Sequence, residues 1–362
     1  MKKKIVATML ACVMAMSLCA CGNSADSSAS TQETTETTET EAEASDDADA
    51  DKEVYKVAIV QYVDDASLNQ IEQNIEKELD AKAAEYGVVF DYADYVYNGQ
   101  ADSTTLNQIA TDIMAENVDL IIPIATPTAM IMQNATAENP IPVVFSAVSD
   151  PVGAGLVAAM DAPGANITGT SDALDTDAIF NLMFAANEEI TSVGLLYDKS
   201  QDSSKAAIEA AKAYCEAKGV SVVEKTGTTN DEISLAADAL IAAGVQAIFT
   251  PSDNTVMTAE LAIFEKFNDA KIPHYTGADS FALNGAFLGY GVNYAQLGVV
   301  TADMAAEILV EGSAVEQMAV RTLDNGIATV NTETAEAIGL DYSMFKDLCD
   351  ELIETTTAEN FE

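Results

Sequence analysis

The sequence predicts an α/β fold of two similar lobes, each a doubly wound parallel sheet, joined by a hinge that the chain crosses several times. Short runs of β-branched and aromatic residues alternate with segments whose apolar residues recur every three or four positions, which is the pattern of strands and covering helices. This alternation runs from Val54 to about Val148 and begins again at Val193. A chain of 362 residues also exceeds what one hydrophobic core usually supports. We therefore expect two lobes with right-handed crossovers.

The first series of elements starts at Val54. We expect its strands at Tyr55–Tyr62, Val88–Tyr95, Leu120–Ile124 and from Pro142 onward. Helices with apolar residues at helical spacing separate these strands, and one of them opens at Thr126-Pro127-Thr128. Proline in the first helical turn costs no hydrogen bond, so this tripeptide is a good helix start.

The second series repeats the pattern. We expect strands at Val193–Tyr197, Val220–Val223, Ala247–Thr250 and Ile272–Tyr275, each followed by a helix or turn. After Gly277, we expect the strand Phe287–Val292 and the helix after it to cross back into the first lobe, with Ala328–Val330 returning to the second. The predicted first lobe is therefore 54–169 with 288–322, and the predicted second lobe is 170–287 with 323–362.

The N-terminal segment predicts secretion and lipid anchoring. Residues 1–20 carry three lysines and then an apolar run that is shorter than a membrane-spanning helix. The run ends Leu18-Cys19-Ala20-Cys21-Gly22, which resembles a bacterial lipobox, so Cys21 is the expected lipidated N-terminus. An ordinary signal peptide cut nearby is the alternative. Residues 21–53 are acidic and lack an apolar pattern, and we expect them to form a disordered tether on the extracytoplasmic face of the membrane.

The composition excludes several classes of function. The formal net charge of −43 leaves no basic face for nucleic acid or for an anionic membrane, so we expect membrane contact through the lipid alone. Removal of the signal leaves Cys21, Cys215 and Cys349, which indicates no disulfide framework, although a bridge between Cys215 and Cys349 stays open.

Catalytic signatures are scarce. The chain has one histidine, His274, at a predicted strand end and without a nearby nucleophile motif, so we expect a structural or rim residue. No nucleophile elbow, zinc-protease motif, phosphate-binding loop or dinucleotide loop occurs, and no cysteine and histidine cluster suggests a metal. We therefore predict a protein without catalytic residues, cofactor or metal.

Polar residues gather instead where the predicted strands end. In open α/β sheets ligands bind at the carboxyl ends of the strands. The run Pro142–Val157 contains a predicted strand followed by a loop of small and polar residues at such an edge. Aspartates there suit an ammonium group, whereas hydroxyls beside free helix amides suit a carboxylate. Each is as often a helix cap or turn residue. The candidates that share this position are Asp65, Ser67, Thr126, Thr128, Ser146, Ser149, Asp150, Ser171, Ser203, Asp253, Asn254 and Asp279.

Several of these residues lie in segments that resemble a known family. The chain is similar to the solute-binding lipoproteins of ATP-driven import systems, in the family that includes tryptophan- and tyrosine-binding members. The matching segments are Ala125–Ala129, Phe145–Val157, Asn166–Asp172, Pro251–Val256 and Tyr294–Gly298. The resemblance implies a type I periplasmic binding protein that closes on its solute. The chain departs from the family after Tyr197 and at Asp279-Ser280-Phe281, where the second lobe should face the solute.

These observations lead to a specific hypothesis. We expect a monomer that captures an α-amino acid, aromatic or bulky and apolar, between its lobes and delivers it to an ABC permease and its ATPase. Thr126, Thr128 and Ser146 would hold the carboxylate. Asp253 or Asp279 would take the ammonium group, with Asp150 as a further candidate. The alternatives are the ligand-binding module of a sensor or receptor, and an extracytoplasmic hydrolase that uses a carboxylate pair.

Overall fold

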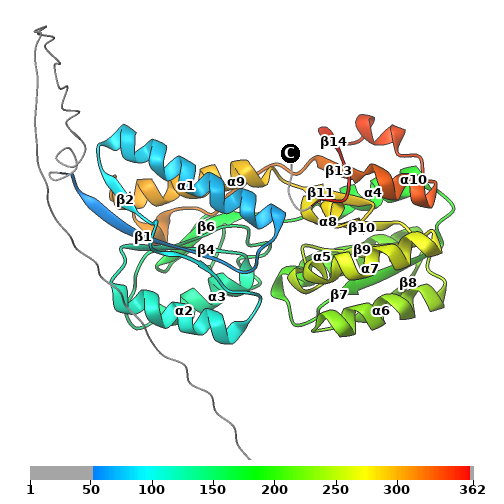
Figure 1. The fold of residues 1–362 in the computed structure, drawn as a ribbon, viewed down its shortest axis with the longest axis horizontal. Coiled ribbons are helices and arrows are strands. Elements are labelled where there is room, and N and C mark those ends of the chain that lie inside the picture. Colours follow the sequence, from blue (N-terminus) through cyan, green and yellow to red (C-terminus); the bar gives the residue numbers. More distant parts are fainter. Residues whose placement is uncertain (1–51, 359–362) are drawn as a thin grey trace, which may run out of the picture. The chain divides into compact units, whose positions relative to one another are not determined.

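A computed structural model describes residues 52–358 of the chain. Two seven-stranded sheets organise these residues (Figure 1). The predicted signal segment, Cys21 and nearly all of the predicted tether lie outside the described residues. None of the helices between residues 52 and 358 combines the length and the apolar character that a membrane-spanning helix needs.

The first sheet has the order β12-β6-β5-β4-β1-β2, and β3 also pairs with β1. All its pairings are parallel, which is the arrangement that the alternating pattern predicts. Its strands are β1 (Val54–Gln61), β2 (Val89–Asp91), β3 (Val96–Asn98), β4 (Leu120–Ile124), β5 (Val143–Phe145), β6 (Ile167–Ser171) and β12 (Arg321–Thr322). Its helices are α1 (Ala66–Tyr86), α2 (Ser103–Glu116), α3 (Thr126–Ala135) and α9 (Tyr294–Leu309). We call these elements the first lobe.

Helices cover the first sheet on two sides. In Figure 1, α1 and α9 lie together on one side of the strands, and α2 and α3 lie together on the other. The central strands between them are buried on both faces, and every residue of β4, β5 and β6 is buried. One predicted strand is wrong in detail, because Val88–Tyr95 is interrupted. The amide of Tyr95 donates a hydrogen bond to the carbonyl of Tyr92, which forms a turn. Two short strands, β2 and β3, therefore pair with successive parts of β1.

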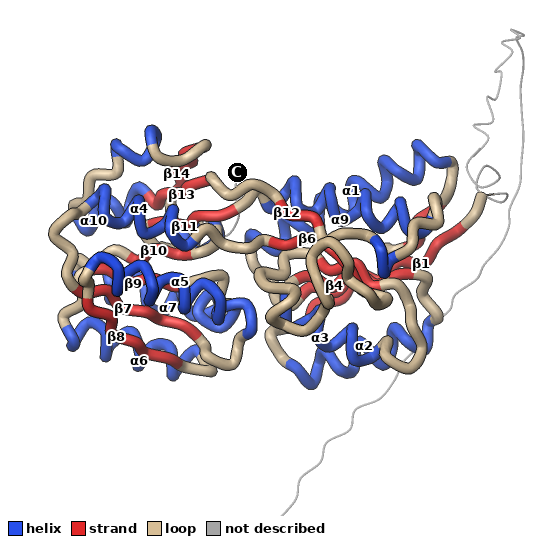
Figure 2. Tube along the Cα trace, turned by 180° about the vertical axis from the view of Figure 1, so that it is seen from behind, coloured by secondary structure: helices blue, strands red, loops and turns tan. Residues whose placement is uncertain are grey.

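The second sheet has the order β14-β13-β11-β10-β9-β7-β8 and forms the second lobe. Its pairings are parallel except that β13 runs antiparallel to β11. Its strands are β7 (Ser192–Tyr197), β8 (Ser221–Thr226), β9 (Ala247–Thr250), β10 (His274–Thr276), β11 (Leu288–Gly291), β13 (Ile327–Asn331) and β14 (Glu351–Thr355). Its helices are α4 (Thr176–Ala186), α5 (Asp202–Lys218), α6 (Asn230–Ala243), α7 (Asn254–Ala270), α8 (Asp279–Leu283) and α10 (Thr332–Ile338). Figure 2 shows the strands of each lobe lying between helices.

The chain passes between the two sheets after β6, after β11 and after β12. The sequence led us to expect the strand predicted at Phe287–Val292 in the first lobe. It does not belong to that lobe. It is β11 of the second sheet, and the crossing follows it. The short segment through α8 returns β11 to the side of β10, its predecessor in the chain, as connections between neighbouring elements usually do.

Two predictions about single residues are settled by burial and contacts. Cys215 and Cys349 are both free thiols, so the bridge left open above does not form in this structure. His274 is buried in the second lobe, where its Nδ1 lies 3.0 Å from Glu260 Oε1 and its Nε2 lies 2.8 Å from Thr250 Oγ1. The histidine is a core residue.

Candidate functional site

A cavity of about 30 Å³ lies between the facing edges of the two lobes. It is far smaller than the roughly 300–1,000 Å³ typical of small-molecule sites, so the lobes must move apart to admit a solute of the size of an amino acid. Its lining combines both lobes and the segment that joins them. The lining residues are Ser67, Leu68, Ala125, Thr126, Ala147, Ser149, Asp172, Ser203, Ser252, Asn254, Met257, Ala278 and Tyr294.

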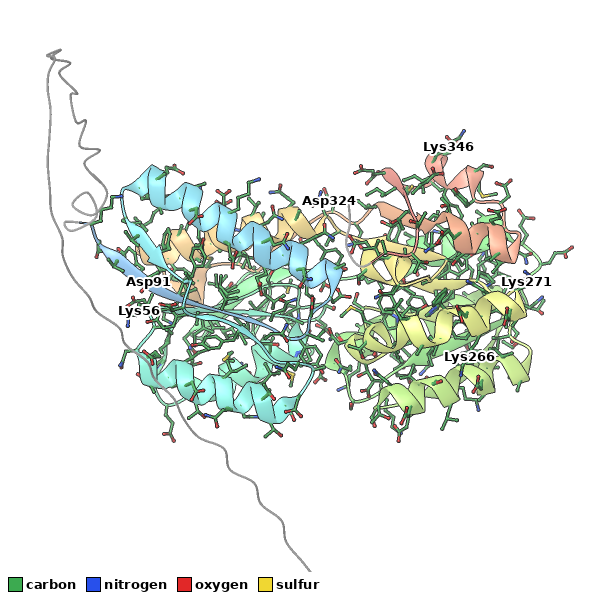
Figure 3. The ribbon with its side chains drawn as sticks, viewed as in Figure 1. Lys56, Asp91, Lys266, Lys271, Asp324 and Lys346 are labelled. Atoms are coloured by element: carbon green, nitrogen blue, oxygen red, sulfur yellow. The ribbon has the colours of Figure 1, made fainter. Side chains whose placement is uncertain are left out.

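No lysine, arginine or histidine belongs to this lining. The lysines labelled in Figure 3, Lys56, Lys266, Lys271 and Lys346, lie on the outer parts of the lobes. Any anionic group in the cavity must therefore be stabilised by backbone amides and hydroxyls.

The first-lobe wall of the cavity includes the start of α3. The chain leaves β4 through Ala125, whose φ of 78° and ψ of 153° are uncommon for a residue with a side chain. Ala125 has no side-chain oxygen, so α3 begins without a side-chain cap, and its first-turn amides have no acceptor within the helix. The hydroxyls of Thr126 and Thr128 are buried and have no hydrogen-bond partner. This end of α3 offers donors and a positive dipole end.

Asp172 supplies the negative charge of the cavity. It follows β6 at the first crossing between the sheets, and the side chain is 6% exposed. Ser149 Oγ donates a hydrogen bond to Asp172 Oδ1 at 3.0 Å. Burial raises the pKa of Asp172 to about 6, although the hydrogen bond from Ser149 acts in the opposite direction. Sequence reasoning did not select Asp172, even though it ends a strand as the selected aspartates do.

Two of the predicted aspartates cap helices instead of facing the cavity. Asp65 accepts the amide of Ser67 at 2.9 Å and caps the start of α1. Asp253 caps the start of α7, and it also accepts the Asp198 amide at 2.8 Å and the Ser204 hydroxyl at 2.6 Å. Burial raises the pKa of each carboxyl to about 6. The donors around Asp253 come from its own lobe, and both of its carboxylate oxygens accept hydrogen bonds from them.

Asp279 makes a contact between the lobes. Its carboxylate accepts hydrogen bonds from the Ser67 hydroxyl and, at 3.1 Å, from Gln70 Nε2, both on α1 of the first lobe. The amide of Ser280 donates to Ser67 Oγ at 3.1 Å from the other side. Burial raises the pKa of Asp279. Both carboxylate oxygens are occupied by protein donors, so the predicted ammonium role of Asp279 is also not supported by its position.

Some of the remaining candidates line the cavity and others do not. Ser146 Oγ lies 2.9 Å from Thr301 Oγ1 in a buried hydroxyl cluster outside the cavity lining. Asp150 accepts the Gly153 amide at 2.8 Å and closes a turn, and Ser171 Oγ accepts the Ala173 amide at 3.2 Å. The predicted residues that do line the cavity are Ser67, Thr126, Ser149, Ser203 and Asn254. Those outside the lining are Asp65, Thr128, Ser146, Asp150, Ser171, Asp253 and Asp279.

Comparison with known proteins identifies the family of the chain. The model of a family described as "ABC transporter substrate binding protein" matches residues 56–344. The chain belongs to this ABC transporter substrate-binding protein family. The family comprises solute-binding proteins and not enzymes, and its members act outside the cytoplasm. Between residues 52 and 358 no group of His, Cys, Asp or Glu side chains is arranged to hold a metal ion.

Individual relatives bind aromatic amino acids by their descriptions. A "Tyrosine-binding protein" of Clostridioides difficile is 30% identical over 291 residues, which are 80% of this chain and 82% of the relative. A structure from Streptococcus pneumonia, described as an ABC domain in complex with L-Trp, is 27% identical with a TM-score of 0.76. That match covers 83% of this chain and 99% of that chain.

A third relative is also a solved structure. It is the ligand-free, open structure of a substrate-binding protein with adhesive properties from Clostridium difficile, 31% identical over 84% of this chain and 100% of that chain. Its TM-score is 0.63, lower than that of the L-Trp complex although its sequence identity is higher.

Proposed function

We propose that this substrate-binding protein captures an aromatic or bulky apolar α-amino acid between its lobes and delivers it to an ABC permease and its ATPase. One observation carries the solute class: the uncapped start of α3 with Thr126 and the carboxylate of Asp172 line the same cavity. An α-amino acid presents a carboxylate and an ammonium group on one carbon. Donors for the first and an acceptor for the second in one small cavity match that pattern.

The charges of the lining support this assignment. Asp172 is the acidic residue of the lining, and no basic residue is present to neutralise it. A ligand ammonium group would supply the missing positive charge, and Ser149 would orient the carboxylate that receives it. We therefore propose Asp172, in place of Asp253 or Asp279, as the ammonium partner. Thr126 and the first amides of α3 remain the proposed partners of the ligand carboxylate.

The apolar part of the lining supports a large side chain. Leu68 on α1, Met257 on α7 and Tyr294 at the start of α9 contribute apolar surface from three directions. Aromatic side chains gain most from such surface, because they bury a large area with few rotatable bonds. The tyrosine-binding and L-Trp-bound relatives favour the same class of solute.

Isothermal titration against the standard amino acids and a sugar panel tests the solute class. We expect heat from tyrosine, tryptophan or phenylalanine and none from sugars. Asp172→Asn should weaken the binding of that amino acid by about 10-fold or more, since a buried charge-assisted hydrogen bond is lost. Asp119→Asn is the control, because Asp119 accepts the Lys56 amide at 2.8 Å and lies outside the cavity lining. Binding confined to sugars, or equal losses in the two variants, would reject the assignment.

Anchoring is a separate part of the proposal, and it rests on the sequence around Cys21. We propose that the chain is cut before Cys21, lipidated there and held at the extracytoplasmic face of the membrane by residues 21–53. Metabolic labelling with a radioactive fatty acid should mark the wild-type protein and not Cys21→Ala. A Cys19→Ala variant, changed at a neighbouring thiol, should keep the label. Equal labelling of both variants would show that Cys21 is not the lipidated residue.

A further inference from the structure

We propose that the ligand carboxylate is held between the N-termini of α3 and α5, one helix from each lobe, so that the carboxylate is the group that couples binding to closure. This inference rests on the proposed function and deepens it. It assigns the second-lobe half of the anion site to Ser203 and the first turn of α5.

Helix capping separates α3 and α5 from the other helices. The helices α1, α2, α4, α6, α7, α9 and α10 each begin with a side chain that accepts a first-turn amide. Among described helices longer than the single turn of α8, α3 and α5 are the ones that begin without such a cap. Their first-turn amides therefore lack the acceptor that a capping side chain provides, although the Ser204 amide of α5 donates to the Gln201 carbonyl at 3.3 Å. An external anion is a suitable partner for such amides.

Unpartnered hydroxyls mark the same two helix ends. Thr126 Oγ1 on α3 and Ser203 Oγ on α5 are buried without a hydrogen-bond partner, and their side chains are 2% and 5% exposed. Both residues line the cavity between the lobes. Buried hydroxyls are nearly always hydrogen-bonded in folded proteins, so these two point to a polar ligand group.

The two helix ends lie on opposite lobes and close to each other. α3 belongs to the first lobe and α5 to the second, and they are in contact at the facing edges of the lobes (Figure 1). A carboxylate has two oxygens with several lone pairs, so it can accept donors from both helices at once. Separation of the lobes removes one set of donors. The carboxylate therefore gains its full set of hydrogen bonds in the closed arrangement alone.

The ammonium side of the cavity differs in this respect. Ser149 follows β5 and Asp172 follows β6, which are neighbouring strands of the first sheet, and the two side chains are hydrogen-bonded. An ammonium group can bind there without any contribution from the second lobe. Ligand analogues that lack one of the two charged groups can therefore separate binding from closure.

The test uses two series of probes. The first is L-tryptophan, tryptamine and indole-3-propionate, and the second is L-tyrosine, tyramine and 3-(4-hydroxyphenyl)propionate. Titration calorimetry measures affinity, and small-angle X-ray scattering measures the radius of gyration. We expect the amino acid and the propionate of a series to compact the wild-type protein, and the amine to bind without compaction. Ser203→Ala should lower the affinity for the amino acid and for the propionate by about 10-fold and leave the affinity for the amine unchanged.

Thr329→Val provides the matched control. Thr329 is also buried with an unpartnered hydroxyl, but it lies on β13 and outside the cavity lining. This variant should bind all six probes as the wild type does, which shows that loss of a buried hydroxyl elsewhere has no effect. Circular dichroism of Ser203→Ala and Thr329→Val confirms that both are folded.

The outcomes separate this inference from the proposed function. If amino acids bind but Ser203→Ala weakens the binding of the amine as much as that of the amino acid, or weakens the binding of neither, the carboxylate site between α3 and α5 is rejected and the proposed function stands. Compaction by the amine also rejects this carboxylate site. If no amino acid binds and a propionate still compacts the protein, the carboxylate site stands and the solute class is wrong. If neither amino acids nor propionates bind, both proposals are wrong.

Discussion

Gln70 on α1 of the first lobe donates a hydrogen bond from Nε2 to Asp279 Oδ2 at 3.1 Å, and Asp279 begins α8 of the second lobe. The Ser67 hydroxyl binds the other carboxylate oxygen. Gln70 and Asp279 lie outside the lining of the solute cavity, whereas Ser67 belongs to it, and the contact joins the lobes through side chains of the protein itself. The stability of the arrangement in which the lobes approach each other therefore depends partly on α1 and Asp279.

Gln70→Ala should weaken this contact and favour separated lobes. Loss of one hydrogen bond to a carboxylate at a partly exposed position should cost about 1 kcal/mol, which lowers the affinity for the solute about 5-fold. Gln73→Ala is the control, since Gln73 is exposed on the same helix. Calorimetry and small-angle scattering measure both effects. Equal affinity in Gln70→Ala and Gln73→Ala would contradict the expected role of the contact.

Binding of the amino acid should depend on pH through Asp172. Its pKa is raised to about 6 by burial, and the ammonium group of the ligand requires the ionised carboxylate. Above pH 7 the carboxylate is already ionised, so the affinity should be constant. As the pH falls through 6, protonation of Asp172 competes with the ligand, and the affinity at pH 5 should be about 10-fold lower than at pH 7.

Asp172→Asn separates this effect from the titration of other groups. Asp65 and Asp253 also have pKa values raised to about 6, but neither lines the cavity. In Asp172→Asn the affinity should be low at both pH values and nearly independent of pH. A wild-type affinity that does not change between pH 7 and pH 5 would argue against Asp172 as the ammonium partner.

Much of the fold followed from sequence pattern, because buried parallel strands and amphipathic helices leave strong local signals. β4, β7 and β9 lie within a residue of their predicted bounds. The lobe to which β11 belongs could not be predicted in this way. A short apolar strand carries no mark of its neighbours, and β11 is placed by pairing with β10 and β13, the second of which lies about 40 residues further along the chain.

The candidate site was predicted at the level of the sheet edge and not of the single residue. Asp65, Asp253 and Asp172 all follow strands, so the position of each after a strand does not distinguish a ligand contact from a helix cap. The difference lies in the next residues: helices begin directly after Asp65 and Asp253 and point their amides at these carboxylates, whereas the chain continues past Asp172 to a different cap, Asp175. Asp172 caps no helix, so its carboxylate is available to a ligand.

The backbone at Ala125 gives a prediction about stability. Its combination of positive φ and extended ψ is essentially confined to glycine and costs of order 1–3 kcal/mol for other residues. Ala125→Gly should therefore stabilise the protein by about 1 kcal/mol, after the greater freedom of glycine in the unfolded chain is subtracted. Ala129→Gly, buried within α3, should instead destabilise it by about 1 kcal/mol. Thermal unfolding compares the two, and destabilisation by both would show that Ala125 is unstrained.

The Glu260 and His274 pair gives a prediction about the second-lobe core. Thr250 Oγ1 donates to the Leu196 carbonyl at 2.9 Å, so the Thr250 oxygen accepts a hydrogen bond from His274 Nε2. The other ring nitrogen, Nδ1, lies 3.0 Å from Glu260 Oε1. A single proton must lie between these two atoms, and it can belong to either partner.

Glu260→Gln should therefore be tolerated, because the amide of glutamine can donate to Nδ1 of a neutral imidazole and fills the same space. We expect a change of less than about 1 kcal/mol in the free energy of unfolding. Glu260→Ala leaves the buried imidazole without its partner beside an empty volume, and should cost about 3 kcal/mol. Urea unfolding of the two variants measures the difference. If glutamine costs as much as alanine, the pair is held by the charge of Glu260 and not by a shared hydrogen bond.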